Sequence, residues 1–259
     1  VTGSVAAGNG GTVQLTAAGT GNITQTGATT ATAILATGAT GGNLAVVGAT
    51  GDVDLQNVTN DVAKVAALVS VAAKHFYYTD ANNLAIDTVA NVGALTSVAG
   101  AVNANPGAST VGITTQGNTL GDVKVYAVAG TLTVNQAVST VPAAGAATPG
   151  GTVVLQASGA ITNVAAGTVT TTGAANTTGV GGVGGEIFIY SSGGTITLGG
   201  LVTAAGGSAT GGGTTGGNGG VVTIRTASGD ILINAAINVS GGVTGSVAAG
   251  NGGTVQLTA

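Results

Sequence analysis

The sequence predicts an all-β chain that winds into a parallel β-helix, or β-solenoid, with about seven coils in each 242-residue period and three short strands in each coil. Three observations predict this fold. The chain has 50 Gly among its 259 residues, and much of the remainder is Val, Thr and Ala. Short pairs of apolar residues recur along it, separated by Gly-rich segments. The first seventeen residues also return unchanged as the last seventeen.

The repetition defines the domain organisation that we expect. The segment Val1 to Ala17 is identical to the segment Val243 to Ala259, at an offset of 242 positions. Self-similarity at a fixed offset is typical of tandem repeat proteins. We therefore expect residues 1–242 to form one period of a β-solenoid and residues 243–259 to begin the next. We expect such a chain to be a segment of a longer array, because each coil is stabilised by stacking on its neighbours.

A first strand is expected wherever two apolar residues flank one outward residue, usually just after a Gly-Gly doublet. This alternation is typical of a half-buried strand. We expect one core ladder with these members: Val13, Leu15, Leu44, Val46, Phe76, Tyr78, Val123, Val125, Val153, Leu155, Ile187, Ile189, Val222, Ile224, Val255 and Leu257. Because neighbouring strands lie about 4.8 Å apart, one period would be about 34 Å long.

Two further strands are expected in each coil. The second follows the first by 8 to 10 residues, at Ile23, Val53/Leu55, Leu84/Ile86, Leu132/Val134, Ile161, Ile196/Leu198 and Ile231/Ile233. The third follows after six to eight more residues, at Val92, Val138, Val169, Val202 and Ile237/Val239. Gly-rich segments such as residues 206–220 then lead to the next coil, and we interpret them as corner loops, where glycine supplies unusual backbone angles.

Two segments fit this pattern less regularly. The interval from Phe76 to Val123 is 47 residues, which leaves room for an eighth coil containing Val98, Val102 and Val111/Ile113. Residues 61–74 place apolar side chains at near-helical spacing, so a short helix is the alternative to strands there. The register of Phe76 with the strand that follows it favours strands.

The composition excludes several classes of protein. Eight acidic and four basic residues are thinly scattered, for a formal net charge of −4, and no basic patch is present for nucleic acid. No apolar run is long enough to span a membrane, since the longest candidate is interrupted by Lys64 and Ser70. The absence of Cys excludes disulfides and thiolate metal sites. It also suits a secreted protein that is stabilised by stacking.

Three repeat units share a common pattern. They are Gly-Gly-Thr-Val-Val-Leu-Gln-Ala-Ser-Gly-Ala-Ile at 150–161, Gly-Gly-Val-Val-Thr-Ile-Arg-Thr-Ala-Ser-Gly-Asp-Ile at 219–231, and Phe-Tyr-Tyr-Thr-Asp-Ala-Asn-Asn-Leu-Ala-Ile at 76–86. These units resemble the repeats of filamentous-haemagglutinin-type exoproteins and of the giant bacterial surface repeat proteins related to them. The resemblance implies a right-handed parallel β-helix, export to the cell surface, and a role in adhesion or extracellular structure.

The outward positions of the first strand hold an unusual share of the large side chains. Four of the six aromatic residues and two of the four basic residues fall there: Tyr77, Lys124, Tyr126, Phe188, Tyr190 and Arg225. We call these six residues the outer stripe. Arg225 is expected one coil away from Tyr190, within reach of a cation–π contact. The stripe either stacks along the fibre axis or forms a contact surface for a neighbouring filament, a glycan or a host-cell ligand.

No enzymatic activity is expected. The only close pair of carboxylates is Asp52 and Asp54, and the expected register places them beside Asn83 and Ala85, away from any basic residue that could support acid–base catalysis. His75 is the only histidine, at a junction between loop and strand, and it cannot form a multi-histidine metal site.

We expect no cofactor, with calcium as the alternative. Five aspartates lie near predicted turns: Asp52, Asp80, Asp87, Asp122 and Asp230. The Gly-Gly-x-Gly-x-Asp nonapeptide of calcium-binding β-rolls does not recur, however.

The sequence therefore predicts a structural protein outside the cell. It would be a segment of a long β-solenoid filament or cell-surface fibre whose main partner is itself, end to end. The alternative is an adhesin shaft that binds a glycan or partner cells through the outer stripe. A carbohydrate-active enzyme is the third hypothesis, and the scarcity of carboxylates argues against it.

Overall fold

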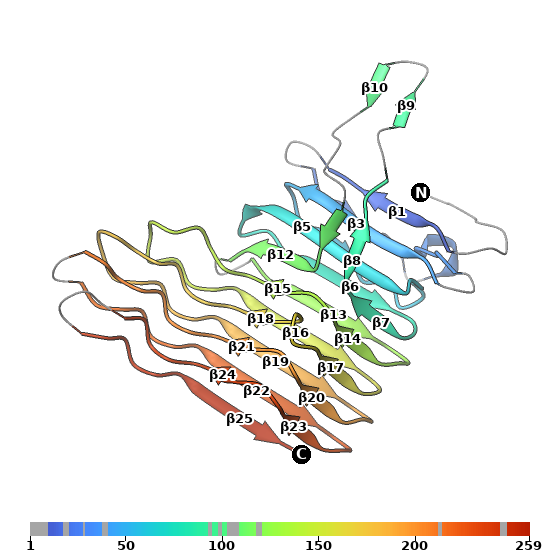
Figure 1. Cartoon of the computed structure of the whole chain (residues 1–259). Helices are drawn as coiled ribbons and strands as arrows, with labels where there is room; N and C mark the ends of the chain where they lie inside the picture. Colours follow the sequence, from blue (N-terminus) through green and yellow to red (C-terminus); the bar gives the residue numbers. More distant parts are fainter. Residues whose placement is uncertain are drawn as a thin grey trace.

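The computed structural model describes residues 10–17, 21–27, 29–37, 41–92, 95–97, 100–102, 109–117, 121–211, 214–243 and 248–259. Over these residues the chain is all-β, apart from one short 3₁₀ helix, η1 (Thr30–Thr32). Strands from successive repeats pair in parallel, so that the chain builds two long sheets (Figure 1). The all-β fold is thus confirmed, and its long parallel sheets are compatible with a β-solenoid.

Sheet 1 contains parallel strands that follow one another in chain order. Its described strands are β2 (Ile23–Thr24), β4 (Val53–Leu55), β6 (Phe76–Asp80), β13 (Val123–Ala127), β16 (Thr152–Ala157), β19 (Glu186–Ser191), β22 (Val221–Thr226) and β25 (Thr254–Thr258). Their register is continuous, as in the series Phe76, Val123 and Val153. Alternating β-branched and aromatic residues favour this half-buried extended state.

Sheet 2 is broader, because it contains two series of short strands that join at β5 (Lys64–Ala72). One series is β7 (Leu84–Ile86), β14 (Leu132–Val134), β17 (Ile161–Asn163), β20 (Ile196–Leu198) and β23 (Ile231–Ile233). The other is β12 (Ile113–Gln116), β15 (Val138–Ser139), β18 (Val169–Thr170), β21 (Val202–Thr203) and β24 (Ile237–Asn238). The sheet continues beyond β5 through β3 (Asn43–Ala49) to β1 (Thr12–Leu15).

The apolar core lies between the sheets. From β4 to β22 the inward residues of sheet 1 form two rows that are at most 3% exposed: Val53, Phe76, Val123, Val153, Ile187 and Val222, and Leu55, Tyr78, Val125, Leu155, Ile189 and Ile224. Complete burial of one such side chain contributes about 1.5–3 kcal/mol. The rows end at β25, where Val255 is 41% and Leu257 is 46% exposed.

The first two pairs of the expected core ladder lie in a different sheet from the other pairs. From Phe76 onward the pairs lie in sheet 1, but Val13/Leu15 and Leu44/Val46 lie in sheet 2, in β1 and β3. Their expected places before Phe76 are taken by Ile23 and Val53, which were expected in the second series. The physical reason is that alternation identifies a half-buried strand without specifying which sheet it joins.

The 47-residue interval between Phe76 and Val123 contains an insertion and not an eighth coil. Two antiparallel pairs form it: β8 (Thr88–Ala90) with β11 (Ser109–Val111), and β9 (Leu95–Ser97) with β10 (Gly100–Val102). The chain leaves sheet 2 after β7, forms this projection and returns at β12 (Figure 1). Ile113 therefore occupies the place in the third series that was expected for Val92.

Residues 64–72 form a strand and not the alternative helix. β5 pairs with β3 on one side and with β7 and β12 on the other, and these pairings give partners to the backbone polar groups of its buried residues from Val65 to Ala67. The strand ends at Ala72, just before Ala73, whose φ of 60° is unusual for a residue with a side chain.

A buried polar corner connects sheet 1 to sheet 2 near the first strands. The Asn60 amide donates to the carbonyl oxygens of Leu55 at 3.0 Å and Thr79 at 3.1 Å. The buried Asp80 carboxylate accepts from the Tyr78 hydroxyl at 2.8 Å and from the Val62 N–H at 3.0 Å. Burial raises the pKa of Asp80 above its ordinary value and raises that of the Tyr78 hydroxyl well above its own.

Beyond the third series, the described residues contribute few large side chains to the core. In what we call the glycine arm (residues 173–185, 205–211, 214–220, 239–243 and 248–253), backbone packs directly on backbone. Gly207 N–H donates to Gly182 O at 2.7 Å, Gly217 N–H to Gly207 O at 2.9 Å, and Gly242 N–H to Gly217 O at 2.7 Å. A Cβ atom at Gly217 would overlap the carbonyl oxygen of Gly182. Glycine is required because only a residue without Cβ permits this approach.

The two identical ends of the sequence occupy different places. The strand Thr12–Leu15 is β1, at the edge of sheet 2, whereas its copy at Thr254–Leu257 belongs to β25, at the edge of sheet 1. Identical residues therefore form a parallel strand in either sheet. Their environment also differs, because Val13 and Leu15 are half-buried against the core while Val255 and Leu257 are exposed.

Candidate functional site on the outer face of sheet 1

The outer face of sheet 1 carries two aligned rows of outward residues. The first row, in register order, is Asp54, Tyr77, Lys124, Val154, Phe188 and Thr223. The second is Tyr126, Gln156, Tyr190 and Arg225. All six residues of the outer stripe thus lie on one face, in neighbouring rows, because a strand turns alternate residues to the same side.

A charged cluster lies at the start of this face, where β4, β6 and β13 begin. Nine of the twelve charged residues of the chain lie between Asp52 and Lys124. Asp52 accepts from Lys74 Nζ at 3.1 Å, and its other oxygen lies 3.3 Å from His75 Nδ1. Burial opposes ionisation of Asp52, but the hydrogen bonds from Lys74 and His75 outweigh it and lower the pKa of the carboxyl.

His75 is the centre of this charged cluster. Val53 N–H donates to His75 O and Phe76 N–H to Asp122 O, so that His75 is flanked by Asp52 on one strand and Asp122 on the next. Its ring stacks on Tyr77 with centroids 4.0 Å apart. Burial raises the pKa of Asp122. Burial also raises the pKa of Tyr77, and the carboxylates of Asp122, Asp54 and Asp52 add to the effect.

An aromatic cluster lies further along the same face. Phe188 and Tyr190 stack with ring centroids 6.1 Å apart, and the Arg225 guanidinium lies 5.8 Å from the centre of the Tyr190 ring. This is the distance of a cation–π contact, which contributes about 0.5–1 kcal/mol at exposed sites. Tyr126 lies two strands before Tyr190 in the same row, with Gln156 between them. The cluster offers flat apolar surface next to one cation.

The sequence pattern missed the charged cluster. It placed Asp52 and Asp54 beside Asn83 and Ala85, whereas Asp54 pairs with Tyr77 and Asp52 lies against Lys74 and His75. The error follows from assigning Val53 to the second series. The 23-residue interval from Val53 to Phe76, which is short for this chain, was the available signal that these two residues are neighbours in one sheet.

Three of the five aspartates considered for calcium make other contacts in the structure, in addition to Asp52 in the charged cluster. Asp87 forms an ion pair with Lys64 at 2.9 Å, Asp80 is buried in the polar corner, and Asp122 accepts from Thr152 N–H at 2.7 Å. Across the described residues, no three side chains of His, Cys, Asp or Glu are grouped so that they could hold a metal ion.

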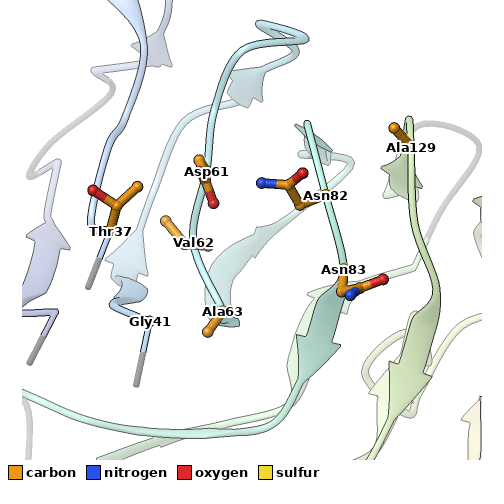
Figure 2. Close-up of a pocket in the computed structure, with 8 residues that line it drawn as sticks. All are labelled: Thr37, Gly41, Asp61, Val62, Ala63, Asn82, Asn83 and Ala129. Carbon is orange, nitrogen blue, oxygen red and sulfur yellow. The ribbon is translucent and has the colours of Figure 1, made fainter. Parts of the chain in front are cut away.

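A shallow pocket of about 340 Å³ lies away from the outer stripe, beside the polar corner. Figure 2 shows its lining: Thr37, Gly41, Asp61, Val62, Ala63, Asn82, Asn83 and Ala129. Asp61 is the only carboxylate in this lining, and Asn83 uses its side-chain oxygen to accept from Thr131 N–H at 2.8 Å. The pocket offers hydrogen-bonding groups but no pair of titratable residues for acid–base chemistry.

Comparison with family models, curated proteins and solved structures gives no match. The site is therefore interpreted from its own geometry. No helix with the length and apolarity of a membrane span occurs among the described residues.

Proposed function

We propose that this chain is a structural segment of a long extracellular filament or cell-surface fibre. In this proposal the fold is a right-handed parallel β-solenoid with about seven coils in each 242-residue period. The supporting observation is the continuous stack of sheet 1, in which successive repeats from β13 to β25 each add one parallel strand in the same register. Each further strand in this register would pair the edge of the strand before it, which is otherwise prone to aggregation.

The recurrence of residues 1–17 as residues 243–259 supports the same proposal. Repetition at a fixed offset is typical of a tandem array whose units are stabilised by stacking on their neighbours. The structural role also agrees with the regular part of the chain. From β13 to β22 each new strand of sheet 1 adds two buried aliphatic residues and few charges.

Electron microscopy of negatively stained material tests the proposal. We expect long, thin, unbranched fibres with an axial repeat of about 34 Å or a small multiple of it, since sheet 1 advances by about 4.8 Å per strand. Isolated short rods at every protein concentration would contradict a filament function. Rods that end in a further domain would favour an adhesin shaft.

An adhesin that binds a glycan is the second candidate, and one observation favours it. Phe188, Tyr190 and Arg225 form a continuous aromatic and cationic surface on the outer face of sheet 1. Tyr126 and Tyr190 lie two strands apart, at about 9.6 Å along the sheet. That distance is close to the length of a disaccharide unit in an extended β-linked glycan, so both rings could stack on sugar faces of one chain.

Binding to immobilised glycans and to cells tests this candidate. The variant Tyr126→Ser, Phe188→Ser, Tyr190→Ser should lose adhesion or lateral association while it keeps the β-sheet circular dichroism spectrum. The matched control is Gln156→Ser, which changes an outward residue between the two tyrosines without removing an aromatic ring. Unchanged adhesion in the triple variant would exclude the stripe as the binding surface.

A further inference from the structure

The pocket beside the polar corner lies in the least regular part of the molecule, where the chain passes from sheet 1 to sheet 2. The connection from β4 to β5 spans residues 56–63, whereas the equivalent connection from β6 to β7 contains only residues 81–83. The longer connection leaves room beside the shorter one, and the pocket of about 340 Å³ lies there. Small-molecule sites usually measure about 300–1,000 Å³, so this pocket has room for a ligand of the size of one sugar ring.

The backbone around the pocket is held in place by hydrogen bonds between coils. Asp61 N–H donates to Ile34 O at 2.9 Å, and Asp61 O accepts from Ala36 N–H at 3.0 Å. In the next coil, Thr131 N–H donates to the side-chain oxygen of Asn83 at 2.8 Å. These bonds fix the positions from which the side chains of the pocket project, so a ligand would meet a preorganised site.

Three polar side chains of the lining have no partner within the part of the chain that the structure describes. They are the Asp61 carboxylate, the Asn82 amide and the Thr37 hydroxyl. Figure 2 shows the Asn82 side chain extending from its own turn toward Asp61. These groups come from three successive coils and line one space, so a single small ligand could contact all of them.

The charges around the pocket favour a cation. Asp61 is the only charged residue among the lining residues that the structure describes, and Val62 N–H in the same wall donates to the buried Asp80 carboxylate at 3.0 Å. Burial raises the pKa of Asp80, and the charge of Asp61 adds to the effect. Lys64, which follows the lining in the sequence, is already paired with Asp87 at 2.9 Å. An anionic ligand would therefore be repelled, whereas a cationic ligand would be attracted.

We propose that this pocket binds a small ligand that carries a primary ammonium group and neighbouring hydroxyl groups, which is the chemistry of an amino sugar. The ammonium group has three donors and no acceptor, which suits the Asp61 carboxylate and the Thr37 hydroxyl. Its charge-assisted bond to Asp61 is the strongest of these contacts. The Asn82 amide both donates and accepts, so it suits a hydroxyl group next to the ammonium. The site does not depend on the proposed filament function, because its lining lies between Thr37 and Ala129 of one chain.

Isothermal titration calorimetry with glucosamine and glucose tests the proposal, because the two sugars differ only in the ammonium group that replaces one hydroxyl. Glucosamine should bind at mildly acidic pH, where its amino group is charged. Glucose should bind at least about tenfold more weakly, since it lacks the hydrogen bond between two charged groups. Added salt should weaken the binding of glucosamine. Equal affinities for the two sugars, or no binding of glucosamine, would overturn the proposal.

A pair of variants locates the site. Asp61→Asn keeps the shape of the side chain and removes its charge, and it should weaken the binding of glucosamine about tenfold. It should leave Tm unchanged or raise it, because the charge that it removes acts against the ionised form of Asp80. The matched control Asp54→Asn removes the same charge from the outer face of sheet 1 and should leave the affinity nearly unchanged. Equal losses of affinity in the two variants would contradict a site at Asp61.

Two further ligands distinguish the amino sugar from other cations. Calcium that binds more tightly than glucosamine would assign the pocket to a metal ion. Tighter binding of Nα-acetyl-lysine amide, which has an ammonium group without hydroxyl groups, would assign it to a lysine side chain of a partner protein. Either result would overturn the amino-sugar ligand.

Discussion

Gly217→Ala is the sharpest test of the glycine arm. A single added methyl group at this position meets the carbonyl oxygen of Gly182, which belongs to the neighbouring repeat. Neither segment can move away easily, because Gly217 N–H donates to Gly207 O at 2.9 Å and Gly217 O accepts from Gly242 N–H at 2.7 Å. The substitution should therefore separate two backbone layers and stretch both hydrogen bonds.

The expected cost follows from these contacts. Overpacking costs about 1–3 kcal/mol, and each weakened hydrogen bond costs about 0.5–1.5 kcal/mol. The smaller conformational freedom of Ala in the unfolded chain offsets about 0.4–1 kcal/mol. We expect Gly217→Ala to lower the free energy of unfolding by about 3 kcal/mol.

Urea denaturation followed by circular dichroism measures this loss, and hydrogen exchange of the Gly242 amide shows whether it is local. The matched control is Gly252→Ala, where the nearest atom to an added Cβ is Val239 O at 4.0 Å. This control should be neutral or slightly stabilising in the single chain. If Gly217→Ala proves as mild as Gly252→Ala, the arm is not held by direct backbone packing and the argument is refuted.

Three further predictions concern the charged cluster, the polar corner and the core. The contacts that lower the pKa of Asp52 stabilise the folded protein at pH values above 3.8, the ordinary pKa of this carboxyl, and this stabilisation is lost as the pH falls through the lower pKa of the folded state. Asp52→Asn should therefore reduce the decrease of Tm on acidification. An unchanged dependence of Tm on pH would contradict this prediction. Asp80→Ala leaves two buried donors unpaired and should cost about 3 kcal/mol in urea denaturation, against less than about 0.5 kcal/mol for the exposed Asp230→Ala. Ile189→Ala should cost about 2–5 kcal/mol, whereas Leu257→Ala in the same row should cost far less in single chains and more in fibres; equal costs in single chains would contradict the burial argument.

The regular part of the fold was predictable from the sequence. From Val123 onward each repeat contains one strand of sheet 1 and two of sheet 2, and alternation with Gly-rich corners is enough to place them. The first quarter was not predictable in the same way, because the long strands β3 and β5 replace pairs of short ones. The insertion between β7 and β12 has the same Val, Ala and Thr composition as the repeats, so composition could not separate a hairpin from a coil.

The aromatic cluster and the charged cluster of the candidate site also differ in how well the sequence predicts them. Phe188, Tyr190 and Arg225 lie in the regular part, where the register follows from the spacing alone, and the structure brings them together. The charged cluster depends on the pairing of Val53 with Phe76, which alternation could not distinguish from pairing with another series. The contact between Asp52 and His75 could therefore not be predicted from the alternation of apolar residues, although both residues had been considered as candidate site residues.

The glycine arm also has a consequence for temperature. Unfolding the side-chain core exposes apolar surface and raises the heat capacity, whereas exposing peptide groups lowers it. In the arm, peptide groups such as those of Gly182, Gly207 and Gly217 are buried against one another with little apolar surface between them. The heat-capacity change on unfolding should therefore be small for a chain of this length, and its stability curve correspondingly flat. Such a molecule retains its fold over a wide range of temperature, including in the cold, where the hydrophobic contribution weakens.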